Sequence, residues 1–188
     1  MERSRSRLGL ETIDVYLLHN PEYMLKRFEL DKHDPIAAKE IFYERIKHSF
    51  LALEQLVQEN KIRCYGVSSN NLGAPEEEYA HVSIVTLTEI ANSISPNHHF
   101  KVAQMPFNWL EVSPLFYEIN NTGHSTISYA QANNIGVMLN RPFNAMFNDG
   151  LVRLTRPQFS ADEIKNFDEG MQNGYENWTT LSTDLESD

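Results

Sequence analysis

The sequence predicts an α/β fold in which parallel β-strands alternate with α-helices. Four short apolar segments, residues 13–18, 62–67, 102–105 and 135–139, have the length and composition of buried strands. Segments with the apolar spacing of helices lie between them. A strand that leads through a helix to the next strand of a sheet makes a right-handed crossover, so the two strands are parallel. We therefore expect one sheet built from about four β/α units.

The first strand is expected at Ile13–Leu18, and its continuous apolar character indicates burial on both faces. It ends abruptly in the polar sequence His19-Asn20-Pro21-Glu22. A helix is predicted next over Ile36–Glu59. Apolar residues recur there every three or four positions, at Ile46, Phe50, Leu53 and Val57.

The second strand is expected at Ile62–Val67 and ends in Ser68-Ser69-Asn70-Asn71. A helix is predicted over Glu76–Ser93, although its middle is rich in β-branched residues, which also favour a strand. The third strand is Val102–Met105, and a long polar connection follows it.

A further helix is predicted at His124–Asn133, and the fourth strand at Ile135–Leu139. We place a domain boundary after residue 157, because residues 158–188 form an acidic, amide-rich tail. The spacing of the tail's apolar residues allows one amphipathic helix, which Gly170 and Gly174 would weaken. The last six residues are expected to be disordered.

Charge and composition exclude several classes of function. The net charge of −10 leaves no basic surface that could neutralise nucleic-acid phosphates, and the basic residues near the N-terminus fit the solvated face of a short helix. One cysteine, Cys64, cannot form an internal disulfide. No apolar run reaches the length of about 20 residues that spans a bilayer. We expect a cytoplasmic protein without nucleic-acid or membrane partners.

The strand ends are where function is expected, because ligands of parallel α/β folds bind at the carboxyl ends of the strands. These ends offer one imidazole (His19), hydroxyls, several amides and one exposed carboxylate (Glu22). We predict no metal site, since His98 and His99 precede a strand on the opposite edge and are expected to face solvent. No glycine-rich phosphate loop is present. Amides and hydroxyls around one histidine suit an amide-bearing ligand beside a carbonyl oxygen.

Four segments together carry a family resemblance: RLGLETIDVYLLHNPE, IRCYGVSSNN, VAQMPFNWLE and NNIGVMLNRPFNA. In this order and spacing they resemble the aldo-keto reductase family, from Glu2 to about Arg156. The resemblance implies a (β/α)8 TIM barrel that binds NADP without a Rossmann motif, and small carbonyl or alcohol substrates. The matching segments correspond to the fourth to seventh strands, so we expect a partial barrel, followed by a tail without resemblance.

The resemblance also implies site residues. His19 corresponds to the active-site histidine that orients the substrate carbonyl. Ser68 corresponds to the serine that, with the residue after it, holds the nicotinamide carboxamide. That next residue is usually asparagine in the family, but here it is Ser69, with Asn70 one place later. Gln104 corresponds to the glutamine that completes the carboxamide site. Arg141 stands where the family often has an aromatic residue stacked on the nicotinamide, and we expect it to form a salt bridge.

The segments that carry the family's catalytic aspartate, tyrosine and lysine have no counterpart in this sequence. We therefore expect a truncated oxidoreductase that is inactive alone. The alternative is a non-enzymatic half-barrel, either a pseudoenzyme or a module that binds a partner protein. Four strands taken from a closed barrel would leave two apolar edges, through which the chain could associate with itself.

Overall fold

The computed structural model describes residues 2–119, 122–147 and 150–155. The chain divides into two compact units, Met1–Leu154 and Thr155–Asp188. The account below concerns the first unit. The helix predicted in the acidic tail and the disorder predicted at its end lie outside the described residues, and the domain boundary after residue 157 stays a prediction.

The first unit contains a four-stranded parallel sheet. Its strands are β1 (Ile13–His19), β2 (Ile62–Ser68), β3 (Phe100–Pro106) and β4 (Gly136–Asn140). They lie side by side in the order β1-β2-β3-β4, and each neighbouring pair is parallel. The predicted α/β class, the parallel pairing and the positions of all four strands are therefore confirmed.

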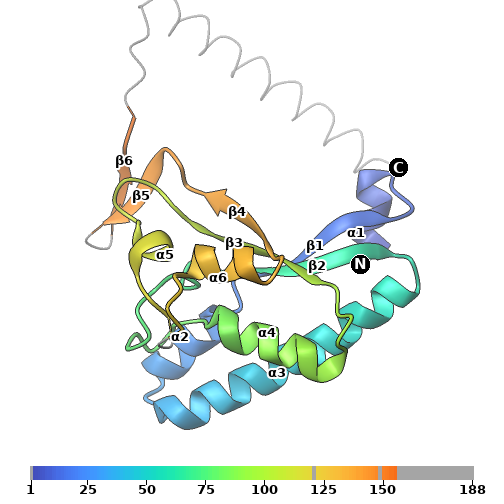
Figure 1. The fold of residues 1–188 in the computed structure, drawn as a ribbon, viewed down its shortest axis with the longest axis horizontal. Coiled ribbons are helices and arrows are strands. Elements are labelled where there is room, and N and C mark those ends of the chain that lie inside the picture. The colour runs from blue at the N-terminus through green and yellow to red at the C-terminus, as the bar shows by residue number, and fades with distance from the viewer. Residues whose placement is uncertain (1, 120–121, 148–149, 156–188) are drawn as a thin grey trace, which may run out of the picture. The chain divides into compact units, whose positions relative to one another are not determined.

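Three helices make the crossovers: α3 (Pro35–Gln58), α4 (Ile84–Ile94) and α6 (Thr126–Ala132). They pack against neighbouring strands and against one another, and they cover one face of the sheet (Figure 1). The helix α3 begins where the sequence predicts a start. The Asp34 side chain accepts hydrogen bonds from the backbone N–H groups of Ile36 and Ala37, and Pro35 occupies the first turn.

An aromatic cluster fastens α3 to the sheet. The ring of Phe50 lies 4.9 Å from the ring of Tyr65 on β2 and 5.2 Å from the ring of Phe100 on β3, measured between centroids. All three side chains are fully buried. Each aromatic pair at such a separation contributes about 0.5–1.5 kcal/mol beyond the burial of its area. The cluster therefore fixes the central strands against their longest helix.

Shorter elements complete the unit. They are α1 (Glu2–Leu8), α2 (Tyr23–Leu30), α5 (Ser113–Phe116) and an antiparallel hairpin of β5 (Asn144–Phe147) and β6 (Gly150–Arg153). The helix α1 agrees with the short N-terminal helix that the basic residues indicate. The sequence did not predict α2, α5 or the hairpin, because none is long enough to show a clear period.

Two expectations, about the helix α4 and the strand β1, are wrong. The helix predicted from Glu76 begins at Ile84, because the Ser83 hydroxyl caps it by accepting a hydrogen bond from the N–H of Thr86. Residues before Ser83 form turns instead. The strand β1 is not buried on both faces, since Val15 is 37% exposed. It is an edge strand of the sheet, and among the described residues it pairs with β2 alone.

Candidate functional site

Three of the predicted site residues lie in one row across the sheet. His19 at the end of β1 is paired with Ser68 of β2, and Ser68 is paired with Gln104 of β3. Residues that face each other on neighbouring strands point to the same side of a sheet. The three side chains therefore share one face at the carboxyl edge, as the parallel topology predicts.

This face is the one that the crossover helices leave uncovered. The preceding pair, Val67 and Ala103, is fully buried in the core formed with α3 and α4. Side chains alternate along a strand, so the next pair, Ser68 and Gln104, points the other way. On this side Ser68 is 1% exposed and Gln104 is half-buried.

A short hydrogen bond joins the two central residues of the row. The Ser68 hydroxyl donates to the side-chain oxygen of Gln104 over 2.7 Å. Within the part of the chain that the structure describes, this is the one side-chain hydrogen bond made by the Ser68 hydroxyl and by Gln104. The His19 side chain is exposed, and its ring nitrogens have no partner among the described residues.

Ser69 and Asn70 lie outside this row. Ser69 is buried and its hydroxyl oxygen accepts a hydrogen bond from the backbone N–H of Asn71, so it shapes the turn after β2. Asn70 donates both its backbone N–H and its side-chain NH2 to one oxygen of Glu22, over 3.0 and 3.2 Å. The structure thus brings His19, Ser68 and Gln104 together and directs Ser69 and Asn70 to other partners.

Glu22 corrects the expectation of an exposed carboxylate at this edge, because its side chain is 0% exposed. The chain turns sharply at Asn20, whose φ of 50° lies in the left-handed region that asparagine tolerates well. Pro21 follows, and Glu22 becomes the residue at the N-terminal cap of α2. The turn folds the carboxylate inward, under the loop that leaves β2. The Asn-Pro pair signals the turn, but no local pattern reveals the partner 48 residues away.

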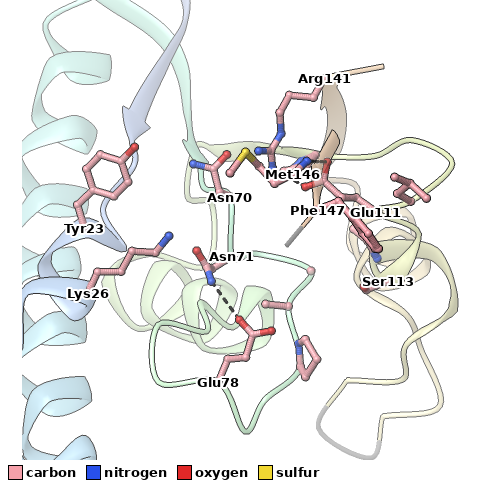
Figure 2. A pocket seen from close by; sticks show the side chains of 16 residues that line it. Tyr23, Lys26, Asn70, Asn71, Glu78, Glu111, Ser113, Arg141, Met146 and Phe147 are labelled. Carbon is pink, nitrogen blue, oxygen red and sulfur yellow. Dashed lines mark hydrogen bonds and ion pairs between the residues drawn. The ribbon is translucent and has the colours of Figure 1, made fainter. Parts of the chain in front are cut away.

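A cavity of about 620 Å³ is lined by segments that follow all four strands (Figure 2), and its lining does not include His19, Ser68 or Gln104. Tyr23 and Lys26 come from α2, and Asn70 and Asn71 come from the loop after β2. Its remaining lining residues include Glu78, Glu111, Ser113, Arg141, Met146 and Phe147. Asn71 donates a hydrogen bond to Glu78 over 3.3 Å, which closes one side of the cavity.

A salt bridge closes another side, as predicted for Arg141. Its guanidinium lies 2.6 Å from one carboxylate oxygen of Glu111. The second carboxylate oxygen of Glu111 accepts a hydrogen bond from the Asn108 side chain over 2.6 Å. The charge of Arg141 is therefore neutralised within the wall. Lys26 and Glu78 are the other charged groups of the lining, so the cavity as a whole carries no excess of either sign.

His98 and His99 lie at the opposite edge, and the expectation that they face solvent is wrong for His98, whereas the His99 side chain is 42% exposed. His98 is 9% exposed, and His99 donates its backbone N–H to Glu54 over 2.7 Å. A ring nitrogen of His99 contacts the other Glu54 oxygen at 2.8 Å. These contacts connect α3 to the start of β3 and have a structural role.

The described residues contain no group of three or more His, Cys, Asp or Glu side chains placed to hold a metal ion. None of the helices in the described part of the chain is long and apolar enough to cross a membrane.

Comparison with known proteins gives one result. The family model described as the aldo/keto reductase family matches residues 1–186. The match extends past Arg156, the last residue of the resemblance seen in the sequence, so the expectation of a tail without resemblance is wrong. The comparison with curated proteins gave no match.

Proposed function

The chain belongs to the aldo/keto reductase family, and from that premise we propose that its strand ends form part of a site for NADP-dependent hydride transfer between small carbonyl compounds and alcohols. Family membership supports an oxidoreductase function. The row of His19, Ser68 and Gln104 on the open face of the sheet is the observation that carries the finer proposal.

The hydrogen-bonding groups of Ser68 and Gln104 fit a nicotinamide carboxamide. A primary carboxamide has an oxygen that accepts hydrogen bonds and an NH2 group that donates them. Gln104 uses its own side-chain oxygen to accept from Ser68, which leaves its NH2 group to donate to the carboxamide oxygen. The Ser68 oxygen can accept from the carboxamide NH2 group. The pair thus offers one donor and one acceptor side by side.

The neighbouring His19 would bind the substrate. Bound NADPH supplies a hydride to the carbonyl carbon, and negative charge develops on the carbonyl oxygen. A ring N–H of His19, at the exposed edge of the same row, can donate a hydrogen bond to that oxygen and orient it. The oxygen must also gain a proton, and the general acid that the family resemblance implies has no counterpart in this sequence. We propose that turnover requires that group from another polypeptide segment.

The cavity lined by the segments after the strands, which does not include the three row residues, can take the remainder of the substrate. Tyr23, Met146 and Phe147 give it apolar surface, while Lys26 and Asn71 offer hydrogen-bond donors. Its volume of about 620 Å³ lies within the range of small-molecule sites.

The test measures NADPH binding and carbonyl reduction separately. Quenching or enhancement of NADPH fluorescence gives its dissociation constant for the purified chain. We expect Ser68→Ala and Gln104→Ala each to raise the NADPH dissociation constant about tenfold. The reason is that each variant loses one or two hydrogen bonds to the cofactor. Gln58→Ala is the matched control, because Gln58 is exposed at the end of α3, away from the row.

Reduction of 4-nitrobenzaldehyde is measured next, alone and after addition of the amino-terminal half of a full-length family member. We expect no turnover alone and measurable turnover after addition, abolished by His19→Ala. Absence of NADPH binding together with no recovered turnover would overturn the proposal and favour the non-enzymatic half-barrel.

A further inference from the structure

We propose that Glu22 is a positioning residue that fixes the loop after β2, residues 69–71, which follows the proposed ligand-binding residue Ser68. The claim about the loop rests on the geometry of the chain itself. Its consequence for the cofactor rests on the proposed function above.

Three contacts hold the loop from both sides. The backbone N–H of Asn20 donates to the Ser68 carbonyl over 2.8 Å, and the N–H of Ser69 donates to the Gln104 carbonyl over 3.0 Å. These two bonds continue the sheet to its edge. Beyond them the loop leaves the sheet, and the double contact from Asn70 to Glu22 is the next attachment.

The burial of the Glu22 carboxylate indicates that its hydrogen bonds to Asn70 contribute to holding the loop. Taking a carboxylate out of water is costly unless hydrogen bonds compensate for the lost hydration. Oxygen Oε1 of Glu22 accepts both bonds from Asn70, whereas Oε2 is buried without a partner among the described residues. The start of α2 carries partial positive charge, which favours an anion at its N-terminal cap. An apolar residue would fill the same space at lower cost but could not bind Asn70.

The bonds to Glu22 also orient the Asn70 side chain where it lines the cavity. One N–H of the Asn70 side-chain NH2 is engaged by the carboxylate, so the second N–H and the carbonyl oxygen are the groups left for a ligand. Asn70, two residues after the row residue Ser68, lines the cavity.

Glu54 provides a matched control for the experiment. Among the described residues, Glu22 and Glu54 are the two buried acidic side chains, and Glu54 also accepts a backbone N–H and a side-chain contact from one residue, His99. It lies at the opposite edge of the sheet. Glu22→Gln and Glu54→Gln should lower the melting temperature by similar amounts, but only Glu22→Gln should change the loop.

The first measurement is hydrogen exchange and the ¹⁵N chemical shifts of the ligand-free protein. We expect the Asn70 backbone N–H and side-chain NH2 to be protected in the wild type and in Glu54→Gln. In Glu22→Gln, whose uncharged oxygen is a weaker acceptor, exchange at Asn70 should rise at least tenfold. Equal exchange at Asn70 in the wild type and Glu22→Gln, or an unprotected Asn70 in the wild type, would overturn the proposal.

The second measurement is the NADPH dissociation constant. We expect it to rise about tenfold in Glu22→Gln and to stay within twofold in Glu54→Gln. If the wild type binds NADPH and Glu22→Gln binds it equally well, the cofactor consequence is wrong. If the wild type does not bind NADPH although Asn70 is protected through Glu22, the proposed function fails while the role of Glu22 in the loop stands.

Discussion

At the scale of single residues, the contact between Glu54 and His99 should make the protein sensitive to acid. Burial alone would raise the pKa of the Glu54 carboxyl, but the hydrogen bonds from His99 outweigh it and hold that pKa below its usual value. A carboxyl whose pKa is lowered by folding stabilises the protein above its unfolded pKa of about 4.3. That stability is lost as the pH falls through the lower pKa of the folded state.

We therefore expect the free energy of unfolding, measured by urea titration, to fall between pH 6 and pH 3. Glu54→Gln should be about 1–3 kcal/mol less stable at pH 6, because its contacts to His99 are weakened. The same variant should lose less stability than the wild type on acidification. Identical slopes for the two proteins would show that Glu54 does not contribute.

His81 gives a second prediction, with a different pH range. It is 4% exposed, and its Nδ1 atom contacts the Ala74 carbonyl at 2.8 Å. Its Nε2 atom is buried without a partner among the described residues. Burial lowers the pKa of this imidazole, although the contact with Ala74 opposes the shift. The unfolded chain therefore takes up the proton more readily, and stability should fall as the pH drops below about 6.5.

The measurement is the melting temperature between pH 8 and pH 5.5. We expect the decrease to be smaller in His81→Gln than in the wild type. His124→Gln serves as the control, because His124 is exposed and its replacement should leave the slope unchanged. Ala74 lines the cavity, so the same protonation should loosen that wall. A wild-type melting temperature that stays constant over this range would contradict the prediction.

The contacts and burial of single side chains were the features that the sequence predicted least well. The row of His19, Ser68 and Gln104 could be predicted, since each stands at the end of a recognisable strand and parallel strands align their ends. The burial of Glu22 could not, because it depends on Asn70, a residue far away along the chain. For the same reason, the contact between Glu54 and His99 was not visible in the sequence.

At the scale of elements, Gly66 should be required for the pairing of β2 with β3. A Cβ atom at this position would contact the Val102 carbonyl oxygen and would lie 2.8 Å from the Val102 Cβ atom. The neighbour is strand backbone and cannot move away without breaking the sheet. We expect Gly66→Ala to lower the free energy of unfolding by about 1–3 kcal/mol, the usual cost of overpacking.

Gly136 is the matched control for this prediction, because it pairs with the same Val102 from the other side. A Cβ atom there would meet no atom closer than 3.5 Å, which is ordinary contact. Urea titration of Gly66→Ala and Gly136→Ala compares the two sites directly. Equal destabilisation would mean that loss of glycine in a strand, and not the clash, is responsible.

Helices and strands could be predicted where they are long or have a clear pattern of apolar residues. The helix α3 shows its apolar period over several turns, and the four strands are apolar runs bounded by polar ends. The start of α4 was misplaced because a capping serine, Ser83, outweighs the helical pattern before it. The helix α2 has a single buried residue, Leu25, so its sequence carries little signal.

At the scale of the whole molecule, the sheet of the first unit has two edges. Within the described residues, β1 pairs only with β2, and β4 pairs only with β3. Apolar side chains lie on both edge strands, where Val15 is 37% and Leu139 is 48% exposed. A closed barrel of eight strands has no such edges. Exposed apolar edge strands are templates for pairing with another chain.

We therefore expect the 188-residue chain to associate with itself at micromolar concentration, measured by sedimentation velocity. Lysine on an edge strand disfavours pairing, because the partner strand would have to bury its charge. Val15→Lys and Leu139→Lys should each shift the distribution towards monomer. Ile36→Lys is the control, since Ile36 is 72% exposed on the helix α3 and away from both edges. A wild-type chain that sediments as a monomer with a sharp, cooperative thermal transition would show that the open edges are tolerated. Association that the two edge variants leave unchanged would place the contact elsewhere.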